Sequence, residues 1–159
     1  MALFQVTELL KIGVEDETTG VSFYTKLAKA TKNDDLRKTY ASLAEQERFH
    51  QARFQKMLDE YDVAQPSETY EGEYIAYLRA MLDSRAFPDP KAAEQAAAKC
   101  KEDADAVTLA IRFERDTLIL MNELRGMVPK KDVGTVDELA REEQGHLVQL
   151  NAALANLAG

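Results

Sequence analysis

Glu45-Gln46-Glu47-Arg48-Phe49-His50 and Glu142-Glu143-Gln144-Gly145-His146 are the two stretches that decide how this chain folds. They contain both histidines of the 159-residue chain, and each histidine follows a glutamate by three residues. On a helix, positions i and i+3 lie on the same face, so a carboxylate oxygen and an imidazole nitrogen can converge on one metal ion. One Glu-x-x-His pair is weak support for a metal site, but its occurrence at both histidines is rarely accidental.

Apolar residues accompany both pairs at helical spacing. The apolar residues that share a helical face with Glu47 and His50 are Tyr40, Leu43, Phe54 and Met57. Those that share a face with Glu143 and His146 are Val136, Leu139, Leu150 and Leu154. An apolar stripe of this kind is the core-facing side of an amphipathic helix. The sequence therefore predicts that Glu47, His50, Glu143 and His146 point into a helical core.

Two further glutamates lie in the apolar stripes of two other helical segments. Glu17 lies among Leu10, Val14 and Tyr24, and Glu114 lies among Val107, Ile111 and Met121. Glu17 precedes Glu47 by 30 residues and Glu114 precedes Glu143 by 29, so the two halves form a pseudo-repeat. A site shared on a local two-fold axis requires such matched positions.

The alternative for these six residues is that they form buried ion pairs or lie on solvated faces. Four carboxylates buried together would cost several kcal/mol each, and no Arg or Lys lies on these stripes. Two divalent ions would cancel the four negative charges. Oxygen-rich, thiolate-free ligands with two imidazoles favour iron, with manganese or zinc as possible substitutes.

Apolar periodicity along the chain predicts an all-α fold, without strand-like alternation. The predicted unit is one domain over residues 1–159, a four-helix bundle with helices over residues 4–30, 35–61, 103–125 and 135–157. A long crossover over residues 62–102 is predicted to contain short helices at residues 70–83 and 90–99. Predicted boundary signals are an N-cap at Asn33 or Asp34, an Asp89-Pro90 start, a stop at Gly126 and a capping box at Thr135-Val136-Asp137-Glu138.

The crossover leaves two arrangements open. It is long enough to return across the bundle, which would make the second and third bundle helices parallel. Alternatively, it would let two chains exchange helix pairs, so a homodimer is expected that is either plain or helix-swapped.

Charge and composition exclude several classes of partner. A formal net charge of −8 argues against nucleic acid and anionic membranes, which bind basic surfaces. The chain has no apolar run of membrane-spanning length and no signal-peptide core, so the expected location is the cytoplasm. Cys100 is the only cysteine, which excludes disulfides and thiolate metal sites within the chain.

One glutamate from each of two helices, with Glu-x-x-His from each of two others, resembles the rubrerythrin branch of the ferritin-like diiron-carboxylate superfamily. The resemblance extends to the surrounding residues Glu17-Thr18-Thr19-Gly20-Val21-Ser22-Phe23-Tyr24 and Phe113-Glu114-Arg115-Asp116. It implies a diiron site with ligands Glu17, Glu47, His50, Glu114, Glu143 and His146. It also implies that Tyr24 lies beside the site as a hydrogen-bonding neighbour.

Two departures from rubrerythrins stand out. The chain lacks the Cys-x-x-Cys rubredoxin domain, and Thr117 stands where the third helix of rubrerythrins carries an additional carboxylate. The resemblance implies an oxidoreductase that reduces hydrogen peroxide or dioxygen under oxidative stress, with electrons from an external, rubredoxin-like donor. A ferroxidase or iron-handling protein is the first alternative, and a structural bundle with an incidental metal is the second. Glu15 and Glu142 are expected to point away from the site.

Overall fold

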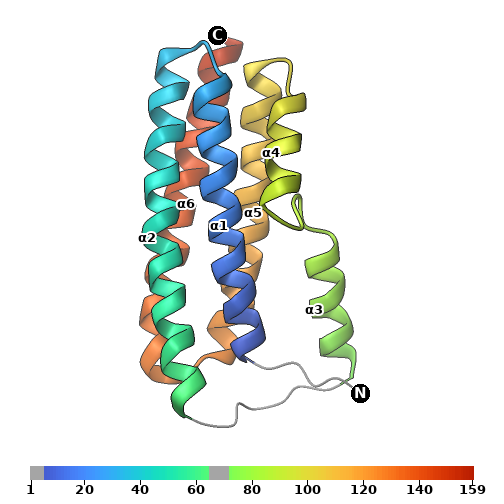
Figure 1. Cartoon of the computed structure of the whole chain (residues 1–159), viewed down its shortest axis with the longest axis vertical. Coiled ribbons are helices and arrows are strands. Elements are labelled where there is room, and N and C mark those ends of the chain that lie inside the picture. Colours follow the sequence, from blue (N-terminus) through green and yellow to red (C-terminus); the bar gives the residue numbers. More distant parts are fainter. Residues whose placement is uncertain (1–5, 65–71) are drawn as a thin grey trace.

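We describe a computed structural model of the chain, which covers residues 6–64 and 72–159 (Figure 1). The described residues form the helices α1 (Val6–Ala30), α2 (Asp34–Ala64), α3 (Glu73–Asp83), α4 (Pro90–Lys99), α5 (Asp103–Met127) and α6 (Lys130–Ala158). The all-α prediction is therefore confirmed. Within the described ranges, no helix combines the length and the apolar content that a membrane span requires.

The long helices α1, α2, α5 and α6 form a four-helix bundle. In Figure 1, α2 and α5 both begin at the end of the bundle that carries the C-terminus, so these two helices run parallel, as predicted for a returning crossover. The crossover helix α4 packs against α1. One chain thus supplies all four bundle helices.

Local capping explains two of the helix starts. The Asn33 side chain accepts hydrogen bonds from the backbone N–H groups of Asp35 and Leu36, at 3.0 and 3.1 Å, which confirms Asn33 as the N-cap of α2. Asp89 accepts from the backbone N–H of Ala92 at 2.8 Å, with Pro90 opening α4 as predicted.

Two predicted boundaries are wrong. α5 continues through Gly126 to Met127, and α6 begins at Lys130, so Thr135 lies inside a helix and does not cap one. Packing overrides the local signals here, because Met127 is buried and Val133 packs against the same apolar cluster. The carboxylate of Asp132 also accepts a hydrogen bond from the Tyr61 hydroxyl at 3.0 Å, which fixes the first turn of α6. The predicted starts at residues 4 and 70 lie outside the described residues.

The core of the bundle consists of two apolar clusters separated along its length. One contains Phe23, Leu27, Leu43, Ala110 and Leu150, and the other contains Leu10, Phe54, Leu120, Met121 and Leu139. On each bundle helix, the glutamates and histidines predicted to bind metal occur between the residues of the two clusters. The candidate site is therefore a polar layer within an otherwise apolar core.

Candidate metal centre

The six predicted ligands come together in this layer from all four bundle helices. Glu17 comes from α1, Glu114 from α5, and the two Glu-x-x-His pairs come from α2 and α6. None of the six residues is more than 1% exposed. The helical stripes identified in the sequence therefore face inward, as predicted.

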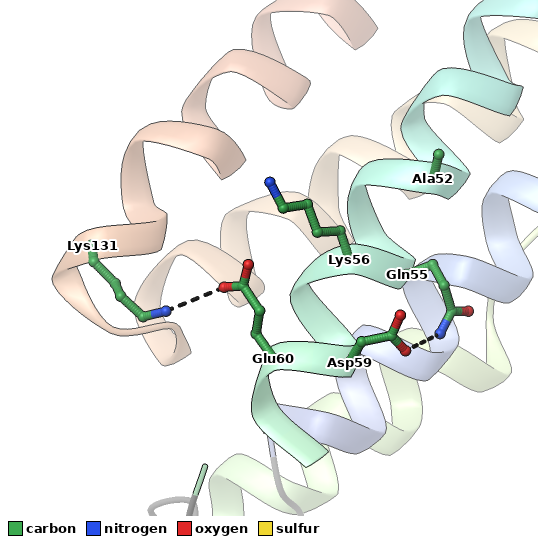
Figure 2. Close-up of a pocket in the computed structure, with 6 residues that line it drawn as sticks. All are labelled: Ala52, Gln55, Lys56, Asp59, Glu60 and Lys131. Atoms are coloured by element: carbon green, nitrogen blue, oxygen red, sulfur yellow. Dashed lines mark hydrogen bonds and ion pairs between the residues drawn. The ribbon is translucent and has the colours of Figure 1, made fainter. Parts of the chain in front are cut away.

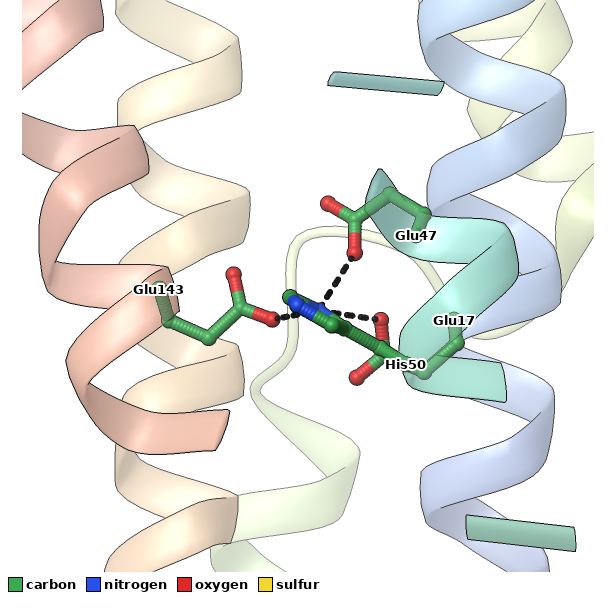
Figure 3. Close-up of side chains that lie close together, drawn as sticks. All are labelled: Glu17, Glu47, His50 and Glu143. Carbon is green, nitrogen blue, oxygen red and sulfur yellow. Dashed lines mark ion pairs between the residues drawn. The ribbon is translucent and has the colours of Figure 1, made fainter. Parts of the chain in front are cut away.

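The ligand atoms form two overlapping groups. Glu17, Glu47, His50 and Glu143 place one ligand atom each within 4.8 Å of one another, and so do Glu47, Glu114, Glu143 and His146. Figure 3 shows the first group, with three carboxylates arranged around the imidazole of His50. Glu47 and Glu143 belong to both groups, so each could bridge two adjacent metal positions with its two oxygens.

Both histidines direct Nδ1 into the layer. His50 Nδ1 lies 2.6 Å from Glu143 Oε1, 3.3 Å from Glu47 Oε2 and 3.6 Å from Glu17 Oε2. His146 Nδ1 lies 2.8 Å from Glu143 Oε2, 3.4 Å from Glu114 Oε2 and 3.6 Å from Glu47 Oε1. The imidazole rings stack with their centroids 5.4 Å apart and an angle of 16° between them. Each ring thus presents one nitrogen to its own set of carboxylate oxygens, and Glu47 and Glu143 contribute one oxygen to each set.

The outward nitrogens contact residues that sequence analysis missed. His50 Nε2 lies 2.7 Å from Glu142 Oε2, and His146 Nε2 lies 3.1 Å from Gln46 Oε1. The expectation that Glu142 points away from the site is wrong, because its carboxylate reaches across from α6 to the α2 histidine. The available signal was spacing: Gln46 and Glu142 each precede the histidine of their own helix by four residues, which places them beside the site and facing the neighbouring helix.

Several inward atoms are close to one another but do not form hydrogen bonds. Both oxygens of Glu47, both of Glu143, Glu17 Oε1 and His50 Nδ1 are buried without a hydrogen-bond partner among the described residues. Buried polar atoms in proteins nearly always have a hydrogen-bond partner, and those without one often surround the site of a bound ion or water. The donor set therefore fits two metal ions: the orphaned atoms surround the shared positions.

Comparison with known proteins gives a consistent family assignment. The family model described as rubrerythrin matches residues 8–154, which is most of the chain. The chain belongs to the rubrerythrin family. A Thermotoga maritima structure described as a proposed ferritin-like diiron-carboxylate protein is 25% identical, with 98% of this chain and 97% of that chain covered and a TM-score of 0.75. A hypothetical protein from Pyrococcus furiosus is 20% identical over 98% of this chain and 91% of that chain, with a TM-score of 0.70, and shows the fold alone. A search of curated protein sequences finds no significant match.

Burial and crowding perturb the protonation of this rubrerythrin-family site. Burial lowers the pKa of each histidine, but the contacts of His50 with Glu143 and Glu17 raise its pKa to about 11, and those of His146 with Glu114 and Glu143 raise its pKa to about 10. Burial and the charge of Glu143 raise the pKa of Glu114 to about 8. Burial, followed by the charge of Glu143, also raises the pKa of Glu17 and raises that of Glu47 well above its ordinary value.

Glu143 is the exception among the four carboxylates. Burial raises its pKa, but the close contacts with the imidazoles of His146 and His50 outweigh burial and hold the pKa well below its ordinary value. Without metal, the layer therefore combines the ionised carboxylate of Glu143 with two imidazolium groups and a protonated Glu114 at pH 7. Protons occupy the places that metal cations would take.

Tyr24 and Thr117 frame the Glu114 side of the layer. The Tyr24 hydroxyl donates to Glu114 Oε1, as the resemblance to rubrerythrins implies. Thr117 is buried, and its hydroxyl donates to the backbone carbonyl of Phe113 at 3.3 Å. Glu114 is therefore the one carboxylate that this turn of α5 directs into the layer among the described residues, since Asp116 accepts a hydrogen bond from the backbone N–H of Ala86 instead.

A glycine gives Glu47 its space. A Cβ at Gly20 would lie 3.1 Å from Glu47 Cγ and 3.2 Å from Glu47 Cδ, closer than most real contacts. The same Cβ would lie 3.2 Å from the Phe113 ring. The sequence places Gly20 three residues after Glu17 on α1, but no pattern along one helix indicates that this glycine makes room for a carboxylate of α2.

The broad groove between the outer faces of α2 and α6 is a separate feature (Figure 2). It measures about 720 Å³ and is lined by Ala52, Gln55, Lys56, Asp59, Glu60 and Lys131. Its polar groups partly satisfy one another, since Lys131 lies 3.3 Å from Glu60 and Gln55 donates to Asp59 at 2.8 Å. None of the six buried ligands lines it, so we do not assign the chemistry to this groove.

Proposed function

We propose that this rubrerythrin-family chain is a diiron oxidoreductase that reduces hydrogen peroxide, or dioxygen, with electrons from an external donor. The observation that carries the proposal is that Glu47 and Glu143 belong to both ligand groups. Two ions held in these groups would share carboxylates and lie next to each other. Glu17 and His50 would complete one position, and Glu114 and His146 the other.

Two iron ions bound there would supply the redox chemistry, in which a ferrous pair gives up two electrons and reduces one peroxide to two waters when two protons are added. The residues of the chain hold the ions close together and balance their charge. Four carboxylates would neutralise the charge of two ferrous ions, so the residues of the layer could hold a divalent pair without burying uncompensated charge.

Burial limits the size of the oxidant. The six ligands and Tyr24 are almost completely buried, between an apolar cluster on each side. A small neutral oxidant such as hydrogen peroxide or dioxygen can reach such a layer, whereas an organic substrate would need the bundle to open. The apolar surroundings also keep bulk water away from the metals.

The electrons would come from outside the chain. With Cys100 as the only cysteine, the chain cannot build the four-cysteine iron site of a rubredoxin. We therefore propose a separate rubredoxin-like protein, or a small reductant, as the donor. An acidic chain would bind a protein donor through a basic patch on that donor, so the reduction rate should fall as salt is raised.

The decisive experiment follows the iron of the anaerobically loaded protein after rapid mixing with peroxide and, separately, with dioxygen. The proposal requires oxidation of both irons, retention of both, and repeated turnover only when a reductant such as rubredoxin is added. Oxidation that consumes Fe²⁺ and releases Fe³⁺ would instead identify an iron-handling protein. Failure to react with either oxidant would leave only a structural role for the metal.

A further inference from the structure

The residue that precedes each Glu-x-x-His pair contacts the histidine of the opposite helix. Gln46, just before Glu47 on α2, approaches His146 of α6, while Glu142, just before Glu143 on α6, approaches His50 of α2. The two contacts are related by the pseudo-two-fold symmetry of the site. Their chemistry differs, because one partner is a neutral amide and the other is a carboxylate.

Other residues hold both partners in place. Arg53 Nη1 donates to Glu142 Oε1 at 3.1 Å, which leaves Glu142 Oε2 directed at His50. The same guanidinium donates to Glu138 at 2.7 Å. The amide nitrogen of Gln46 approaches the Ser42 hydroxyl at 3.3 Å and the Ser42 carbonyl at 3.4 Å, so its Oε1 faces His146. Each contact is therefore part of a local network.

We infer that Glu142 and Gln46 are positioning residues for the two histidines, and that their difference in charge makes the two metal positions inequivalent. The position at His50 takes the first ion, and the position at His146 takes the second. This inference rests on the proposed metal centre and adds an order of filling to it.

The physical reason lies in the proton on the outward nitrogen. An imidazole that binds metal through Nδ1 keeps its proton on Nε2 and donates it to the partner. A carboxylate acceptor makes a stronger, charge-assisted hydrogen bond than an amide and draws the proton away more strongly. The inward nitrogen becomes a better donor to the metal, and partners of this kind change metal affinity by roughly 10- to 100-fold. His50 should therefore be the stronger metal ligand.

The test is stepwise titration with Zn²⁺ of the unmodified full chain and of four variants. In the unmodified chain we expect two resolved binding steps. Glu142→Gln keeps an acceptor but removes its charge, so the first step should weaken by about tenfold and approach the second. Gln46→Glu should strengthen the second step, and the double variant carrying both changes should again give two resolved steps. Glu138→Gln is the matched control, because it removes a nearby charge that pairs with Arg53 and does not contact a histidine.

A second measurement identifies which position fills first. The chain has only two histidines, so ¹⁵N-histidine spectra contain two imidazoles, and Glu142→Gln identifies the signals of His50. At one equivalent of Zn²⁺, the Nδ1 signal of His50 should shift in the unmodified chain, and that of His146 should shift in the double variant. A role limited to folding would not reverse the order. Binding of two ions with the same order in every variant would overturn this inference alone, whereas binding of fewer than two would overturn the metal centre as well.

Discussion

Metal binding should release about three protons at pH 7, because the layer is protonated where metals would bind. His50 and His146, with pKa values raised to about 11 and about 10, each carry a proton on the inward nitrogen. Glu114, with a pKa of about 8, holds one more. Coordination requires neutral imidazole and ionised carboxylate, so these three protons must leave.

The release can be measured by titrating the metal-free chain with Mn²⁺ in a calorimeter, in buffers with different heats of ionisation. Affinity for the pair of ions should rise by up to about 10³ per pH unit near pH 7, and the number of protons released should fall above pH 8 as Glu114 ionises. In the variant His146→Gln, one fewer proton should be released. Release of fewer than two protons at pH 7 would show that the layer is already ionised and would refute this account of its electrostatics.

The same shifts predict that the melting temperature of the metal-free chain falls as pH rises from about 5 to 9, and less so with metal bound. A group whose pKa is raised in the folded state stabilises the fold at pH values below its unfolded pKa, and this stabilisation is lost as pH rises to the folded pKa. The loss should occur between pH 4.5 and about 8 for Glu114, and between pH 6.5 and about 10 for His146. A melting temperature that does not change with pH would contradict this prediction. Gly20→Ala should displace the Glu47 side chain, cost about 1–3 kcal/mol of stability and weaken metal binding. The matched control is Gly145→Ala, where a Cβ meets nothing within 4 Å, and it should be neutral or stabilising. Metal at about 100 times its Kd should stabilise the chain by about 2.7 kcal/mol for each bound ion, seen as a higher melting temperature that a chelator reverses. Glu47→Ala and His146→Ala should lose this stabilisation while circular dichroism stays helical, and the exposed Glu15→Ala should retain it; equal loss in all three would mean that the faces are misassigned.

Much of the site could be predicted from the chain alone because it depends on helical periodicity. Glu17 and Glu114 were identified by their positions in apolar stripes, and the histidine pairs by their i, i+3 spacing. A residue in an apolar stripe of a bundle helix faces the core whatever the details of packing. Periodicity along the individual helices is therefore sufficient to predict that all six residues meet in the core.

Residues that act across helices could not be predicted in this way. Glu142 lies beside the apolar stripe of α6 and appeared solvated, but its carboxylate contacts His50 because α2 and α6 pack side by side at that level. Gly20 matters only because Glu47 of the next helix occupies the space that its side chain would fill. Helix register and separation, which no single helix determines, decide both contacts.

The start of α6 illustrates the division between sequence and tertiary structure. The sequence by itself determined that four amphipathic helices bury four carboxylates and two imidazoles, because spacing along one helix fixes which side chains share a face. It also contained a local capping signal at Thr135, which the folded chain does not use. Only tertiary structure decided that α6 extends back to Lys130, that Glu47 and Glu143 are shared between the two ligand groups, and that the histidines have partners of different charge. These features depend on contacts between helices, where the free energy of packing exceeds that of a single cap.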